Sequence, residues 1–133
     1  PLYNLISEMC PDKKVFMIYG GTDVEQREEI RQIVDKEDNA ILVASYGTCS
    51  TGINIKNIHN IIFTSPSKSV IRVLQSIGRG LRRSDNKDSM KLYDLADNLS
   101  HKKYRNHTMR HLDARIKIYN KEHFDYKLIS MKI

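Results

Sequence analysis

The sequence has few cysteines and no long apolar run. None of its apolar runs approaches the roughly 18 residues that a membrane-spanning helix needs, so such a helix is excluded. The N-terminus has no basic region followed by an apolar run, so no signal peptide is visible. The two cysteines, Cys10 and Cys49, each stand alone, which excludes a disulfide scaffold and favours a reducing compartment. We therefore expect a cytoplasmic protein.

The composition is that of one folded domain with an uneven charge. Of the 133 residues, 40% are hydrophobic and 29% are charged, which excludes a disordered polymer and leaves room for one core. Residues 1–66 carry six basic and nine acidic side chains, a net charge of −3. Residues 67–133 carry sixteen and seven, a net charge of +9. Either a polyanion binds one face or this half has a solvated basic surface, and charge alone does not decide between them.

Short apolar runs alternate with amphipathic segments as far as residue 95. Apolar residues at positions 2, 5, 6 and 9 predict a helix that stops at Cys10-Pro11-Asp12. Thr22 or Asp23 can cap a second helix, which is predicted to end near Lys36. A third helix is predicted over 68–83. Strands that alternate with helices predict a parallel sheet with right-handed crossovers. The predicted buried strands are 15–19, 41–44, 58–63 and 90–93.

From residue 101 the pattern changes. Residues 104–119 predict a basic helix, and Phe124 to Leu128 alternate like a half-exposed strand. We therefore divide the chain into an α/β domain over 1–100 and a basic helical and strand extension over 101–133.

Two groups of polar residues are weak candidates for a catalytic or metal site. Asp94 and Asp97 follow the last predicted strand and are interpreted as helix caps rather than catalytic acids. His107 and His111 stand four residues apart, but the helix lacks the Glu of a zinc-protease motif. No metal site is predicted.

A loop rich in hydroxyl groups follows the strand predicted at 41–44. Residues 45–54 supply Ser and Thr hydroxyls, two glycines and a run of backbone N–H donors, which suit phosphate oxygens. Gly47 and Gly52 have the spacing that begins a P-loop. The next residues are Ile53-Asn54 rather than Lys followed by Ser or Thr, so a Walker A site is excluded. The alternative interpretation is an ordinary polar loop.

The helix predicted over 68–83 separates its apolar and basic residues. At about 100° per residue, the apolar side chains gather on one side and the basic ones project from the other. Arginines at this density bind phosphate as planar, bidentate donors, although a solvated basic face is the alternative. The projecting residues are Lys68, Arg72, Gln75, Arg79, Arg82 and Arg83.

These two segments, in this order along the chain, resemble two motifs of a known protein family. Residues 41–55 resemble motif V, and residues 75–82 resemble motif VI, Gln-x-x-Gly-Arg-x-x-Arg, of the second RecA-like domain of superfamily 2 helicases. The form Gly-Arg-Gly-Leu-Arg points away from the RNA-remodelling branch and towards DNA translocases and branch-migration enzymes. The tail, from Tyr93 to Tyr126, is similar to phage recombination helicases of the UvsW type.

The resemblance implies a fold and a function. The fold is an α/β, RecA-like three-layer domain with a central, mainly parallel sheet flanked by helices, lacking its first strand, with a C-terminal helix and strand appendage. The function is the C-terminal motor half of an ATP-dependent DNA helicase or translocase acting on branched DNA in recombination and stalled-fork repair. In a phage it would work in the cytoplasm of the host cell. The alternative is a non-catalytic nucleic-acid-binding α/β module.

The resemblance also assigns residues. Arg79 and Arg82 match arginines that reach the ATP γ-phosphate and act catalytically. Asn54 stands where the family has Asp, so an amide would contact the ribose. The residues expected to bind ATP are Gly52, Asn54, Gln75, Arg79 and Arg82. By the same resemblance, Ser45 and Thr48 are expected to face the DNA backbone. The positive charge of the tail, rather than the resemblance, predicts that Lys102, Lys103, Arg105 and Arg110 also bind DNA.

The chain holds half of the expected machinery. It contains no Walker A lysine and no Asp-Glu-x-His box. ATP and Mg²⁺ would therefore be bound mainly through the N-terminal RecA-like domain of the same protein, which is the expected partner besides DNA. The chain alone is expected to hydrolyse no ATP.

Overall fold

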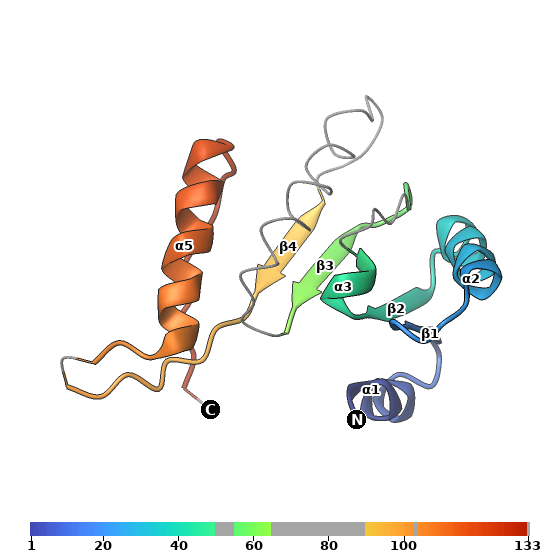
Figure 1. Cartoon of the computed structure of the whole chain (residues 1–133), viewed down its shortest axis with the longest axis horizontal. Helices are drawn as coiled ribbons and strands as arrows, with labels where there is room; N and C mark the ends of the chain where they lie inside the picture. The colour runs from blue at the N-terminus through green and yellow to red at the C-terminus, as the bar shows by residue number, and fades with distance from the viewer. Residues whose placement is uncertain (50–54, 65–89, 103, 133) are drawn as a thin grey trace.

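The structure is a computed structural model that describes residues 1–49, 55–64, 90–102 and 104–132. Helices and strands alternate along most of the chain, as the apolar pattern predicts (Figure 1). The predicted helix over 68–83 lies outside the described residues. The elements are α1 (Leu2–Met9), β1 (Lys14–Ile18), α2 (Val24–Lys36), β2 (Ala40–Ala44), α3 (Tyr46–Cys49), β3 (Asn60–Phe63), β4 (Lys91–Asp94) and α5 (His107–Lys121).

The strands form two parallel pairs. β1 pairs with β2, so that Ile18 and Ala44 end side by side. β3 pairs with β4, so that Phe63 and Asp94 end side by side. The four strands and their parallel pairing are as predicted, with bounds shifted by a few residues. Within the described residues, however, β2 and β3 do not pair, and two two-stranded sheets replace the single sheet that was expected.

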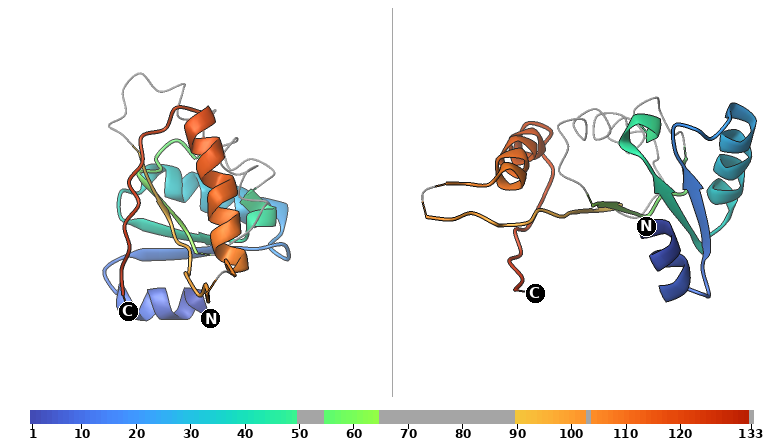
Figure 2. Two further views of the ribbon diagram at one scale, coloured as in Figure 1. Left: turned by 90° about the vertical axis from the view of Figure 1, so that its left-hand side faces the viewer. Right: turned by 60° about the horizontal axis from the view of Figure 1, so that its bottom comes forward.

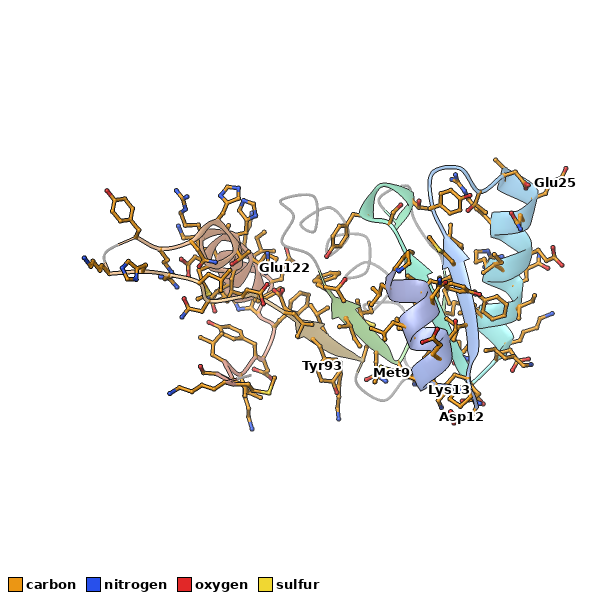
Figure 3. The ribbon with its side chains drawn as sticks, turned by 90° about the horizontal axis from the view of Figure 1, so that it is seen from below. Met9, Asp12, Lys13, Glu25, Tyr93 and Glu122 are labelled. Carbon is orange, nitrogen blue, oxygen red and sulfur yellow. The ribbon has the colours of Figure 1, made fainter. Side chains whose placement is uncertain are left out.

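Helix α1 is the amphipathic helix predicted at the N-terminus. It ends at Cys10, whose backbone N–H donates to the Ile6 carbonyl oxygen. None of its residues is buried, and Met9 is 73% exposed. Met9, the last residue of α1, is labelled in the view from below (Figure 3).

Helix α2 shows which of the two candidate caps operates. The Asp23 carboxylate accepts a hydrogen bond from the Gln26 backbone N–H at 2.8 Å, which makes Asp23 the N-cap. Thr22 is buried instead, and its hydroxyl oxygen accepts from the Tyr19 backbone N–H at 3.1 Å. The helix ends at Lys36, as predicted.

A core lies between α5 and the β3–β4 pair. Phe63 and Tyr119 are buried at its centre, 4% and 6% exposed. Helix α5 runs beside the β3–β4 pair, opposite the side occupied by β1 and β2 (Figure 1). The partly buried residues packed against the centre are Tyr46, Ile61, Leu92, Ile116 and Phe124.

The strand predicted at Phe124 to Leu128 is wrong. These residues form no strand, and the segment runs along α5 (Figure 2). The rings of Phe124 and Tyr126 lie 6.4 Å and 6.0 Å from the ring of Tyr119. The alternating pattern therefore reflects aromatic side chains that pack on a helix, since aromatic pairs at such distances are favourable without a sheet.

Replacing Asp23 with Ala should lower the free energy of unfolding by about 0.5–2 kcal/mol, because the first turn of α2 loses its side-chain acceptor. Asp23→Asn, which keeps an accepting oxygen, is the control and should retain most of the stability. Urea unfolding of the three proteins measures the difference. Equal stability of Asp23→Ala and the wild type would show that the cap contributes nothing.

Candidate functional site

The first edge that could hold a ligand lies at the carboxyl ends of β1 and β2. In open α/β sheets ligands gather at such ends. Two loops follow the strands, 19–23 after β1 and the turn into α3 after β2. The Ser45 backbone N–H donates to the Ile18 carbonyl oxygen at 3.2 Å, which extends the pairing of the strands into the second loop.

Ser45 and Thr48, both predicted to bind DNA, lie together at this edge. Their hydroxyl oxygens are 2.7 Å apart in a hydrogen bond, and the Thr48 backbone N–H donates to the Ser45 carbonyl oxygen at 3.1 Å. Ser45 is exposed, whereas Thr48 is 7% exposed. Ser45 is therefore the surface member of the pair, and Thr48 lies behind it and orients its hydroxyl group.

Arg27 holds the neighbouring loop in shape, a role that the sequence did not reveal. Its Nε donates to the Thr22 carbonyl oxygen at 2.8 Å, and its Nη2 donates to the Gly20 carbonyl oxygen at 3.1 Å. The Tyr19 ring covers Gly21 so closely that a Cβ there would lie 2.7 Å from a ring carbon. The sequence feature that could have indicated this role is an arginine in the first turn of a helix that follows a pair of glycines.

The residues predicted to act on ATP lie outside the described residues. The same holds for one of the predicted DNA-binding lysines. These residues are Gly52, Asn54, Gln75, Arg79, Arg82 and Lys103.

A second polar cluster lies at the carboxyl end of β4. Arg115 donates to both carboxylate oxygens of Asp94, from Nε at 2.7 Å and from Nη2 at 2.8 Å. The Tyr119 hydroxyl donates to the same carboxylate at 2.6 Å. Arg115 is 2% exposed, and the Asp94 side chain is 10% exposed. We call these three residues the Asp94 cluster. The interpretation of Asp94 as a helix cap is therefore wrong, because its carboxylate is occupied by α5.

The electrostatics of the Asp94 cluster follow from its burial. A buried carboxylate needs an opposite charge and hydrogen bonds, and the bidentate guanidinium supplies both. Burial raises the pKa of Tyr119 well above its usual range, and the hydrogen bond to Asp94 adds to the rise. The cluster therefore joins α5 to the end of β4. A sequence signal for it was present, since Arg115 and Tyr119 stand four residues apart on one helical face.

The basic tail begins in a loop that leads into α5. Lys102 and Arg110 are exposed, and Lys102 has a left-handed backbone with φ of 51°. Arg105 forms an ion pair with Asp113 at 2.8 Å, yet its side chain remains 54% exposed. The Asn106 side-chain amide donates to the Asp97 carbonyl oxygen at 2.8 Å, which closes the loop. The carboxylate of Asp97 therefore plays no part in this contact.

His107 and His111 lie on the same side of the first turns of α5. Their ring centroids are 4.2 Å apart. In the part of the chain that the structure describes, no three His, Cys, Asp or Glu side chains are grouped to hold a metal ion. No described helix is long and apolar enough to cross a membrane.

The family is decided by comparison with known proteins. Residues 3–84 match the family model of the helicase conserved C-terminal domain. The chain belongs to this family. It is 35% identical over 130 residues to the ATP-dependent DNA helicase uvsW of Enterobacteria phage T4. That match covers 90% of this chain and 26% of the relative, so the chain spans about a quarter of that helicase.

A solved structure confirms the fold. The crystal structure of the C-terminal part of the Fun30 ATPase domain matches with a TM-score of 0.55 and 15% sequence identity. The match covers 90% of this chain and 44% of that one. The predicted α/β fold of a helicase C-terminal, RecA-like domain is thereby confirmed.

The pH dependence of stability tests the Asp94 cluster. Tyr119→Phe should destabilise the chain near pH 8 by about 1.5–3 kcal/mol, the worth of a hydrogen bond to a charged group. Because the pKa of Tyr119 is raised in the folded state, its stabilisation is complete below the ordinary tyrosine pKa of about 10 and is lost as the pH rises further. The difference between wild type and variant should therefore shrink above pH 10.

Urea unfolding at several pH values between 8 and 11 measures this difference. The other titrating groups are common to both proteins, so their effects cancel in the comparison. A difference that stayed constant across the range would show that Tyr119 does not titrate differently in the folded and unfolded chains.

Proposed function

We propose that this chain is the C-terminal motor half of an ATP-dependent DNA helicase or translocase that acts on branched DNA in recombination and stalled-fork repair. The observation that carries the proposal is the Gln-x-x-Gly-Arg-x-x-Arg sequence at 75–82, inside the family match over 3–84. The relationship to an ATP-dependent DNA helicase over nearly the whole chain supports it.

In this proposal the chain supplies arginines, and another domain supplies the phosphate-binding lysine. Arg79 and Arg82 would reach the γ-phosphate of ATP across the interface with the N-terminal RecA-like domain of the same protein. Such arginines stabilise the charge of the transition state. Gln75, Gly52 and Asn54 would hold the nucleotide, and Mg²⁺ would be bound mainly by the other domain. Hydrolysis would open and close the cleft between the domains.

DNA would contact two parts of this chain. Ser45, backed by Thr48, presents a hydroxyl group at the carboxyl edge of β2, which suits a phosphate oxygen. The cations of the basic tail would add sequence-independent attraction to the backbone. They are Lys102, Lys103, Arg105 and Arg110.

The alternative proposal is a nucleic-acid-binding module without nucleotide chemistry. Backbone binding needs only positive charge, whereas motif VI fixes a spacing between a glutamine, a glycine and two arginines. The spacing favours the motor. A test of one motif arginine distinguishes the two.

In the intact helicase, Arg82→Ala should lower kcat for DNA-stimulated ATP hydrolysis by about 10³-fold or more and leave ATP binding within a few-fold of wild type. The helical period predicts that Arg82 lies away from the apolar side, so its loss should affect chemistry more than folding. Arg82→Lys should restore little, because an ammonium group cannot make the planar two-pronged contact.

Arg83→Ala is the matched control, since Arg83 is adjacent but outside the motif. Steady-state ATPase assays and nucleotide titrations give kcat and the affinity for ATP separately. Near-normal hydrolysis by Arg82→Ala would reject the catalytic assignment and favour the binding module.

Reversing the charge of Lys102 and Arg110 together should weaken DNA binding by the chain and reduce its salt dependence. Each lost phosphate contact should lower the slope of log affinity against log salt by about 1. Arg105 is left unchanged because its ion pair with Asp113 would become a repulsion. Lys36→Glu with Lys56→Glu, exposed positions in the acidic half, is the control that changes the net charge equally. An equal effect of both double variants would mean that binding follows net charge alone.

A further inference from the structure

Tyr104 presents its aromatic ring to solvent at the end of the loop before α5. It is 85% exposed, more than any other large apolar side chain in the described part of the chain. An exposed tyrosine offers a large planar face on which another ring can stack. Figure 1 shows the loop, in orange, extending beyond α5 on the side away from β1 and β2.

The backbone around Tyr104 is fixed by hydrogen bonds. The Tyr104 N–H donates to the His101 carbonyl oxygen at 2.9 Å, and the His101 N–H donates to the Tyr104 carbonyl oxygen at 3.1 Å. Lys102, inside this turn, has the left-handed backbone that a tight reversal requires. The ring therefore projects from a closed turn, and little backbone entropy would be lost when a ligand stacks on it.

The surroundings of the ring select the class of ligand. An open hollow of about 340 Å³ lies beside it. Arg105 is oriented by Asp113 and keeps its guanidinium at the surface. Lys102, which lines the same hollow, is exposed. A planar ring flanked by cations suits an uncharged planar group that is joined to anionic groups. The hollow is lined by Asn98, Ser100, Lys102, Tyr104, Arg105 and Met109.

We infer that Tyr104 stacks on the base of an unpaired nucleotide, while Lys102 and Arg105 contact the adjoining phosphates. This inference rests on the proposed DNA-binding function and adds a residue and a specificity to it. Bases in a duplex already stack on one another, whereas an unpaired base offers a free face to an aromatic ring. The tail would therefore prefer single-stranded DNA, such as the strand displaced at a branch.

The test measures binding of the full chain to a single-stranded oligonucleotide with 2-aminopurine at one position, and to the same sequence as a duplex. Tyr104→Ala should bind the single strand about 5-fold to 150-fold more weakly, the range for one base stacked on an aromatic side chain. Binding of the wild type should quench the fluorescence of 2-aminopurine, and Tyr104→Ala should lose this quenching. Duplex affinity should stay unchanged, and so should the salt slope on both DNAs, because the ring carries no charge.

Two further variants make the result specific. Tyr104→Phe keeps a stacking face and should bind like wild type. Leu99→Ala removes a side chain that is 77% exposed in the same loop and serves as the matched control, with no expected effect. Since Tyr104 is exposed, all the variants should unfold at the same temperature as wild type.

The remaining outcomes would overturn the inference. Equal weakening on single strand and duplex would show that the ring does not read unpaired bases. A loss in Tyr104→Phe as large as in Tyr104→Ala would assign the effect to the hydroxyl group rather than to stacking. Normal DNA binding combined with Tyr104-dependent self-association in sedimentation would identify a protein contact. Wild-type chain that bound no DNA would remove the proposed DNA contact of the tail together with this inference.

Discussion

The bidentate contact between Arg115 and Asp94 is the interaction on which the C-terminal third of the molecule depends. It is the most buried charged contact in the described structure, and the Tyr119 hydroxyl completes it. Removing one partner of such a pair costs about 3–5 kcal/mol because the other charge stays buried, whereas an apolar replacement of the whole pair can be neutral. The contact between Arg115 and Asp94 therefore fixes the position of α5 on β3 and β4. It says little about the overall stability of the domain.

The position of α5 attaches the basic tail to the carboxyl ends of β3 and β4. Asp94 is the last residue of β4, and Tyr119 shares a core with Phe63 at the end of β3. A movement of this strand pair would therefore carry α5 and the loop before it. The boundary at residue 100 stays a prediction. Beyond it, Ile116, Tyr119 and Phe124 share a core with residues of β3 and β4. In the proposed motor, a shift of this half during ATP hydrolysis would move the basic tail along with it.

Local patterns in the sequence were enough to predict most of the elements. The helical stripe of α1, the cap and length of α2, and the four apolar strands all follow from residues close together in the chain. Contacts between distant residues were not predictable in the same way. Asp94 meets Arg115 across 21 positions, and the alternation at Phe124 to Leu128 looked like a strand until Tyr119 was seen to receive it. For the site, the role of Ser45 and Thr48 in DNA binding stays a prediction. Their unequal exposure was not predictable, because burial depends on contacts between distant parts of the chain.

The Asp94 cluster separates the one buried arginine of α5 from the cations on the surface of the tail. Arg115 points inward, and Asp94 of β4 neutralises its charge. The acid of this pair is therefore buried and does not lower the positive charge of the outer face of α5. The outward cations of the tail, Lys102, Arg110, Lys117 and Lys121, remain exposed. Among residues 101–121 the single acid, Asp113, orients Arg105 and leaves its side chain half exposed. Positive charge of this kind attracts any nucleic-acid backbone, whatever its sequence. Recognition of unpaired bases needs, in addition, uncharged groups held in fixed positions beside these cations.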